Sequence, residues 1–201
     1  ADYRTQALGR DLLMTGASAI ERVFHGQPSG LDHTVIINGG CVRYRRDDTP
    51  HFQAIEFGRP IPLVVAWTPR HGSTREAVDG LRARYEALPA NYDSLFSAMG
   101  SLAEDGIKAL ESGDLPRLGA LMDLNHGYLN ACGVSHPSNE TMVMVARAHG
   151  ALGAKLTGAG LGGSVIALPG DEPDTLAMAL RSEGFDVFVT ELRNPPRDFP
   201  K

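Results

Sequence analysis

The hydrophobic positions of the chain first follow a helical period and then a pattern typical of strands. Apolar residues recur at helical spacing from about Leu8 to Phe24. His25-Gly26 predicts the end of that helix, because glycine readily supplies the left-handed closing residue. Two later runs, at 34–46 and 52–67, are rich in Val and Ile and predict strands. The Gly39-Gly40 pair inside the first run predicts a tight turn or bulge.

After Trp67 the pattern becomes mainly helical. Ser73 and Glu76 have the spacing of a capping box, which predicts a helix from Thr74 to the break at Pro89. We place a domain boundary here, with one domain over 1–72 and a second over 73–201. Further periodic segments predict helices at 92–112, 115–133 and 139–151, then a glycine stretch at 155–164, a strand at 165–170, a helix at 174–184 and a strand at 186–192.

Composition and charge narrow the class of protein. The 201 residues are 42% hydrophobic and 21% charged, which is typical of a soluble globular protein with a real core. The net charge of -5 and the scattered basic residues argue against nucleic-acid and membrane partners, because both require a basic face. The short basic run Arg43–Arg46 is typical of a solvated strand end. Cys41 and Cys132 are too few for a disulfide framework, so we expect inert thiols in a reducing cytoplasm.

The stretch KLTGAGLGGS, at 155–164, holds four glycines in six positions. Glycine permits positive φ and carries no Cβ atom, so backbone amides can converge on an anion. Gly158, Gly160 and Gly163 match the pattern G-x-G-x-x-G, but a dinucleotide fingerprint needs a helix next, and a strand is predicted instead. An anion-binding loop and a purely structural turn between two strands both fit this stretch.

Three other residues have positions typical of phosphoryl-transfer chemistry. Thr74 begins a predicted helix, where free amides and the helix dipole favour phosphate, although capping alone also explains that sequence. Glu21 is either a surface acid or a metal ligand in the last turn of the first predicted helix. Asp32 follows Pro28-Ser29-Gly30 just before a predicted strand, either in an Asx-type turn or as a catalytic carboxylate. Two acids flanking one loop favour phosphoryl transfer, with one for Mg²⁺ and one for a hydroxyl.

Three segments carry a resemblance to a known family: ERVFHGQPSGLDH at 21–33, LNHGYLNACGVSHPSNE at 124–140 and GALGAKLTGAGLGGSVIAL at 150–168. They resemble the galactokinase–homoserine kinase–mevalonate kinase–phosphomevalonate kinase superfamily and, within it, the mevalonate kinases. The resemblance covers nearly all of the 201 residues. The P-S-G-x-D element and the L-G-V-S-type segment (here Cys132–Ser135) are fairly specific for mevalonate kinases, whereas the glycine stretch marks only the superfamily.

The resemblance implies an α+β fold of two domains. The first would be the rest of an N-terminal α/β domain like domain 2 of ribosomal protein S5, and the second a ferredoxin-like domain. It also implies ATP-dependent, Mg²⁺-dependent phosphorylation of the C5 hydroxyl of mevalonate in the isoprenoid pathway. A homodimer is what the family suggests.

Carried over residue by residue, the resemblance makes Asp32 the catalytic acid that takes or orients the proton of the substrate hydroxyl. It makes Glu21 a Mg²⁺ ligand and puts Thr74 near the transferring phosphate. The remaining matched residues would contact the substrate or the phosphates: Ser29, Gly30, Gly158, Ala159, Gly160, Gly162 and Gly163.

The chain also departs from the family pattern. The 201 residues do not contain the family's other glycine-rich loop, P-x-x-x-G-L-G-S-S-A, and they begin without Met in a helix-like pattern. We therefore expect a piece of a longer protein with little kinase activity by itself. Residue 33 is His where the family usually has Asn, and residue 161 is Leu where Gly is frequent. Another kinase of the superfamily, for phosphomevalonate or a sugar, and a non-catalytic metabolite-binding protein on this fold are the alternatives.

Overall fold

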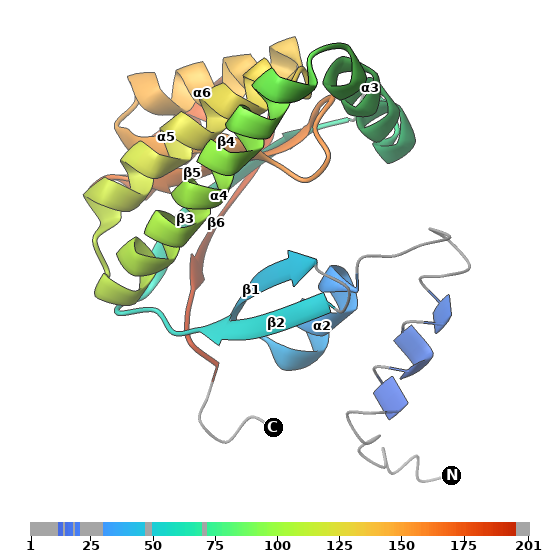
Figure 1. Ribbon diagram of the computed structural model, residues 1–201. Helices are drawn as coiled ribbons and strands as arrows, with labels where there is room; N and C mark the ends of the chain where they lie inside the picture. Colours follow the sequence, from blue (N-terminus) through green and yellow to red (C-terminus); the bar gives the residue numbers. More distant parts are fainter. Residues whose placement is uncertain are drawn as a thin grey trace, which may run out of the picture. The chain divides into compact units, whose positions relative to one another are not determined.

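A computed structural model describes residues 12–13, 15–17, 19–20, 30–46, 50–69 and 72–195 (Figure 1). The chain divides into two compact units, the first formed by residues 1–56 and 193–201 and the second by residues 57–192. Residues 12–13, 15–17 and 19–20 are helical, as the first period predicts. The predicted end of this helix at His25-Gly26 lies outside the described residues.

The described core of the first unit is a short helix and a two-stranded ribbon. Helix α2 (Leu31–Asn38) leads through Gly39 and Gly40, both at positive φ, into the antiparallel strands β1 (Cys41–Arg46) and β2 (Pro50–Ile55). The predicted turn at this glycine pair is confirmed.

The predicted strand at 34–46 is wrong in its first part, because 34–38 belongs to α2. The segment TVII is a short, wholly apolar run, and such a run has the same appearance in a helix and in a buried strand. Two features at its ends favour the helix. Asp32 in the first turn complements the helix dipole, and the backbone N–H of Gly39 closes the last turn on the carbonyl of Val35.

The second unit is built on a four-stranded antiparallel sheet in the order β4-β5-β3-β6, from strands β3 (Ile61–Thr68), β4 (Ala151–Thr157), β5 (Gly163–Pro169) and β6 (Asp186–Leu192). Together with the helices between β3 and β4 and between β5 and β6, this order is the ferredoxin-like topology that the resemblance implies. The predicted strand at 52–67 is divided by residues 56–60 into β2, in the first unit, and β3, in the second.

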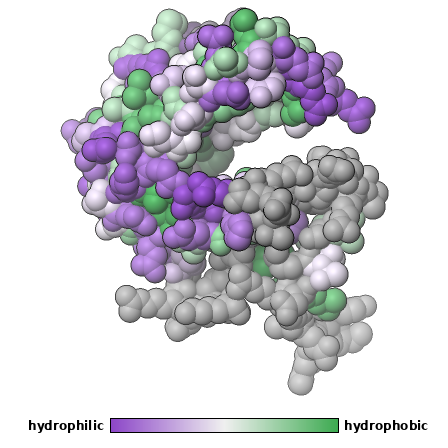
Figure 2. Space-filling model, in the orientation of Figure 1, coloured by the Kyte–Doolittle hydropathy of each residue, from purple (hydrophilic) through white to green (hydrophobic). Residues whose placement is uncertain are grey.

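Helices of the second unit cover one face of this sheet (Figure 1). Val64, Leu156 and Val165 point from the sheet into a core shared with α6 and α7. Three of the helices, α5 (Leu115–Ala131), α6 (Pro137–Ala148) and α7 (Pro173–Ser182), pack on the strands, whereas α4 (Pro89–Ser112) packs on α5 and α3 (Thr74–Ala87) contacts α4. Among the described residues, none of the helices is long and apolar enough to cross a membrane. Hydrophilic residues alternate with scattered hydrophobic ones on the face seen in Figure 2.

The helix starts of this unit follow their local sequence. Ser73 caps α3 in the predicted capping box: its hydroxyl accepts the N–H of Glu76, and the Glu76 carboxylate accepts the N–H of Ser73. Proline stands in the first turn of α4, α5, α6 and α7, where its missing N–H leaves no bond unmade. These helices and strands β5 and β6 confirm the predicted elements in their predicted order. Strand β4 was not predicted, and the helix predicted at 139–151 ends at Ala148, before this strand begins.

The division into units differs from the predicted domain ranges of 1–72 and 73–201. Strand β3 forms ladders with both β5 and β6, so it is a central strand of the second sheet although it precedes residue 73. The division therefore falls at residue 56, ahead of β3.

Candidate functional site

The loop between β4 and β5 has an unusual backbone. Gly158, Gly160, Gly162 and Gly163 have φ angles between 76° and 92°, and Leu161 has a φ of 56°. Leu161 is the one non-glycine residue at positive φ in the described part of the chain. Glycine adopts this region without a steric penalty, whereas a residue with a Cβ atom does so at a cost. The glycines of this segment, called here the glycine loop (158–163), are therefore required by its shape.

A strand follows the glycine loop, since β5 begins at Gly163. The absence of a helix at this point excludes the dinucleotide fingerprint, as predicted.

The glycine loop rests on the connection between α5 and α6. The N–H of Leu161 donates to the carbonyl oxygen of Val134 at 2.8 Å. A Cβ atom on Gly160 would lie 2.1 Å from the same oxygen, so only glycine fits there. Asn139, on α6, bonds both backbone polar groups of Gly162. The loop is thus held from one side by main chain and from another by a buried amide.

The start of α3 lies beside the glycine loop, drawn in orange in Figure 1. Thr68, at the end of β3, pairs with Gly163. A Cβ atom on Gly72 would lie 2.8 Å from Cδ1 of Leu161. Thr74 is the first residue of α3 and is exposed. The structure therefore brings together the predicted helix start at Thr74 and the predicted loop at 158–163, both within the second unit.

Asp32 lies in the first turn of α2, exposed to solvent. Gly30 is the N-cap of this helix with a φ of 80°, a conformation that glycine adopts without a steric penalty. A Cβ atom on Gly30 would be 3.7 Å from the rings of His33 and Phe52, which is an ordinary contact distance. Asp32 and Gly30 belong to the first unit, and the glycine loop belongs to the second.

Two predicted site residues, Glu21 and Ser29, lie outside the described residues. Within the described part, no three His, Cys, Asp or Glu side chains gather as a metal-binding group. A Mg²⁺ site does not require three such side chains, because Mg²⁺ binds through one or two carboxylates together with water and phosphate oxygens. An exposed carboxylate such as Asp32, with a second acid nearby in sequence, is compatible with that kind of site.

A buried polar cluster, which the motifs did not predict, lies behind the glycine loop. His126 on α5 is 3% exposed; its Nδ1 accepts the N–H of Leu156, and its Nε2 is 3.2 Å from Glu140. Glu140 also accepts hydrogen bonds from Ser135 and Asn130. The cluster ties α5, α6 and β4 together at the end of the sheet that carries the loop.

Burial controls protonation in this cluster. It lowers the pKa of His126, and the attraction of Glu140 offsets only part of that effect. Burial also raises the pKa of Glu140, but hydrogen bonds from Ser135 and Asn130 and the nearby His126 outweigh it and leave that pKa below its usual value. Burial lowers the pKa of Lys155, whose Nζ donates to the carbonyl of Leu156. A neutral His126 fits its role as an acceptor, since a protonated ring has no free lone pair.

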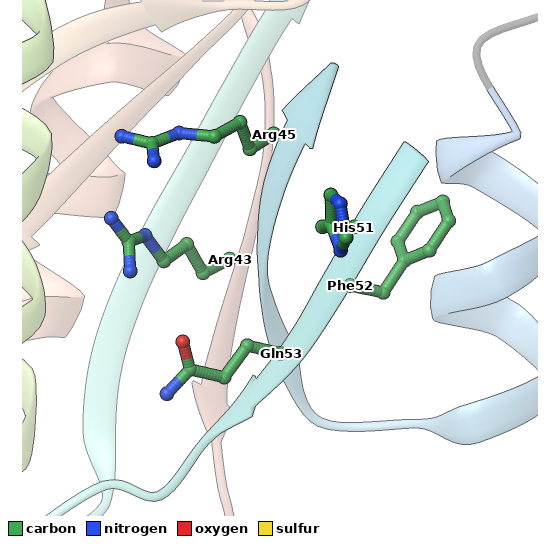
Figure 3. Close-up of a pocket in the computed structure, with 5 residues that line it drawn as sticks. All are labelled: Arg43, Arg45, His51, Phe52 and Gln53. Atoms are coloured by element: carbon green, nitrogen blue, oxygen red, sulfur yellow. The ribbon is translucent and has the colours of Figure 1, made fainter. Parts of the chain in front are cut away.

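The ribbon of the first unit bears a hollow of about 380 Å³. It is lined by Arg43, Arg45, His51, Phe52 and Gln53 (Figure 3). The register pairs Arg43 with Gln53 and Arg45 with His51, so these four side chains share one face of the ribbon. Figure 3 shows Phe52 directed away from the two arginines. The basic run at 43–46 thus lies at a strand end as predicted, and this face is rich in donors.

Comparison with known proteins gives a consistent result. The family model described as GHMP kinases C terminal matches residues 107–186. The chain is 37% identical over 177 residues to the mevalonate kinase of Pyrococcus furiosus, covering 86% of this chain and 52% of that protein. It is 31% identical over 188 residues to the mevalonate kinase of Arabidopsis thaliana, covering 89% of this chain and 49% of that protein.

Among solved structures, the chain resembles that of L. major mevalonate kinase in complex with R-mevalonate. The TM-score is 0.87 at 31% sequence identity, and the match covers 93% of this chain and 59% of that one. The chain therefore spans about half the length of the curated relatives it matches.

Proposed function

Because the chain belongs to the GHMP kinase superfamily, we propose that the protein carrying it acts as a mevalonate kinase. That protein transfers the γ-phosphoryl group of ATP to the C5 hydroxyl of mevalonate. The main support within the structure is the glycine loop, with φ positive at five of its six residues beside the start of α3. This arrangement suits an anionic ligand, because turns of this kind direct backbone N–H groups into a concavity and a helix start favours negative charge.

In this proposal each part has a separate task. Glycine-loop amides and the start of α3 at Thr74 hold the phosphates, while Ser29, Gly30 and Ala159 line the substrate site. Asp32 orients the hydroxyl and takes its proton as the oxygen bonds to the γ-phosphorus and ADP leaves. A Mg²⁺ ion held by Glu21 would neutralise charge on the phosphates.

Asp32 is suited to this task by its position. It is exposed on the first turn of a helix whose N-cap is a glycine at positive φ, so the carboxylate is presented to solvent at the end of a helix. An exposed carboxylate at a helix start can also be only a favourable dipole partner, worth about 0.3–1 kcal/mol. Removing the carboxylate would reduce turnover if Asp32 is catalytic, and would leave turnover unchanged if Asp32 is only a dipole partner.

The assay is ADP release with mevalonate and ATP by the protein that carries these residues. Asp32→Asn should keep the fold and cut kcat by about 10²–10⁴-fold, because it removes the group that accepts the proton. Asp171→Asn, on the surface of the second unit, is the matched control and should leave kcat unchanged. Full activity in a folded Asp32→Asn protein would refute the assignment.

The acceptor is tested separately. Mevalonate, phosphomevalonate, galactose and homoserine are compared at equal concentration in the same assay. Mevalonate should give the highest kcat/KM, and a preference for another acceptor would identify a different kinase of the superfamily. A non-catalytic metabolite-binding protein would bind mevalonate or ATP in titration calorimetry and release no ADP with any acceptor.

The remaining proposals concern assembly and compartment. Cys41 and Cys132 are both unpaired in the structure, which suits the reducing cytoplasm. The homodimer is proposed from family resemblance, and light scattering of the purified protein tests it. Dependence on Mg²⁺ is tested by adding EDTA to the assay, which should abolish ADP release.

A further inference from the structure

Asn139 occupies a position behind the glycine loop where an apolar residue would normally be expected. It is the third residue of α6 and is fully buried, at 0% exposure. Its neighbours along the helix, Met142 and Val143, are core residues. A buried amide is stable only when its donors and acceptors find partners, so its bonds identify its task.

The side chain of Asn139 bonds one residue of the loop twice. Its Oδ1 accepts the N–H of Gly162 at 3.0 Å, and its Nδ2 donates to the carbonyl oxygen of Gly162 at 3.2 Å. The two bonds fix the peptide groups on both sides of the Gly162 Cα atom. The orientations of the Leu161–Gly162 and Gly162–Gly163 peptides are therefore set by one side chain.

The loop needs such a constraint. Glycine has the largest conformational freedom of any residue, and Leu161 is held at a φ of 56°, which is unfavourable for a side chain with a Cβ atom. Without these two bonds, called here the clamp, only the bond from the Leu161 N–H to Val134 and the pairing of Gly163 in β5 would, among the described residues, hold the segment from Gly160 to Gly163 in this conformation. The amides on the open side of the loop would then lose their common direction.

We propose that Asn139 is a positioning residue, which holds the glycine loop in the conformation that receives the transferring phosphate. The inference rests on the proposed function of the loop. Asn139 does not touch the ligand in this proposal, since both of its polar atoms are bonded to Gly162. The N–H of Gly162 is likewise used inside the protein, so Gly162 contributes shape rather than a phosphate contact.

The main test is Asn139→Asp, which changes one atom. Ionised aspartate still accepts the Gly162 N–H, but its second oxygen faces the Gly162 carbonyl and repels it. Protonated aspartate can donate there and restores both bonds. Burial and the nearby carbonyl favour the protonated form, so the variant should act like the wild type at low pH and lose the clamp as pH rises.

Two measurements report on the hydrogen bonds between Asn139 and Gly162. In the 201-residue chain, amide exchange measured by NMR should show the protection of Gly162 fall at least 10-fold between pH 6 and 8 in Asn139→Asp but not in wild type. In the assay, kcat of the variant relative to wild type should fall at least 10-fold over the same range, with KM for mevalonate within 3-fold. Leu176→Val, in the core of α7, is a control for general loosening and should change neither ratio.

The outcomes separate this inference from the proposed function. A wild type without turnover, with Gly162 protection still dependent on Asn139, would refute the kinase and leave the clamp in place. Turnover in wild type with a pH-independent kcat ratio in Asn139→Asp would overturn the positioning role. Unchanged Gly162 protection in Asn139→Asp at a pH where the introduced carboxyl group is ionised, as followed by its ¹³C chemical shift, would overturn the clamp itself. If the variant folds poorly at pH 8, the same criteria are applied to measurements between pH 6 and 7.

Discussion

At the scale of single residues, the glycine loop shows two different reasons for a glycine. Gly158 and Gly160 both have φ near 80°, yet a Cβ atom on Gly158 would meet nothing within 4 Å, whereas one on Gly160 would lie 2.1 Å from the Val134 carbonyl oxygen. Conformation alone requires the first glycine. Conformation and close packing together require the second.

This difference predicts a matched pair of variants. Gly158→Ala should lower the free energy of unfolding by about 1 kcal/mol, because alanine is strained in the left-handed conformation. Gly160→Ala should cost clearly more, because the loop must also move away from Val134. Urea unfolding followed by the fluorescence of Trp67, the single tryptophan of the chain, measures both, since Trp67 lies in β3 of the second unit. Equal losses for the two variants would show that the Val134 contact does not constrain the loop.

A second prediction at this scale concerns His126 and acid. In the folded state burial lowers the pKa of His126, while the unfolded chain keeps a value near 6.5. As pH falls below about 6.5, the unfolded state therefore takes up the proton first, and the second unit should lose stability. Above that pH the contribution is fully present.

Unfolding midpoints measured between pH 7.5 and 5 test this. His126→Gln should flatten the decline in stability across that range. His149→Gln is the control, because His149 is exposed at the end of α6. A wild-type midpoint that does not change from pH 7.5 to 5, or an equal slope in His126→Gln, would contradict the prediction.

At the scale of elements, the packing of α5 on β4 depends on two facing glycines. A Cβ atom on Gly153 would lie 2.0 Å from the carbonyl oxygen of Gly119, and one on Gly119 would lie 2.4 Å from that of Leu152. Backbone therefore meets backbone at this crossing. The close approach also lets Asp123 of α5 accept the N–H of Ala154 at 2.8 Å.

Gly153→Ala should consequently destabilise the second unit by about 2 kcal/mol or more, as expected for overpacking in a tight interface. Gly127→Ala lies in the same helix with nothing within 4 Å of its Cβ position, and should stabilise by about 0.5–1 kcal/mol through helix propensity. Urea unfolding of the two variants beside wild type gives both values. A neutral Gly153→Ala would mean that α5 can move off the sheet at little cost.

Elements with strong local signals were predictable from sequence. Ser73 and Glu76 set the start of α3, and the strand after the glycine loop was evident from SVIAL. Helix α2 was not, because an apolar run of a few residues has no period that distinguishes helix from strand. Residues 31–38 form a helix and not a strand because of Gly30 and Gly39, whose backbone conformations appear only in the folded chain.

At the scale of the whole molecule, the structure makes β3 the strand that joins the second unit together. It pairs with β5 on one side and β6 on the other. Residues 57–192 therefore contain a complete sheet, whereas the predicted domain from residue 73 lacks a central strand.

Two truncated chains test this division. Residues 57–192 should give a dispersed NMR spectrum and a cooperative unfolding transition. Residues 73–192 should not, because β5 and β6 would each lose a partner and expose unpaired backbone groups. Cooperative folding of the shorter chain would instead support the boundary near residue 72.

The sequence by itself determined the class of the protein and most of the candidate chemistry. Glycines at fixed spacing, a helix-start signal at Ser73 and an acid after P-S-G are local features, and local features can be recognised without a structure. The tertiary structure decided the contacts behind these features: the bonds of Asn139 to Gly162, the burial that lowers the pKa of His126, the facing glycines of α5 and β4, and the central position of β3 in the sheet. These depend on contacts between residues far apart in the chain, and no local pattern records which distant partner a buried group will meet.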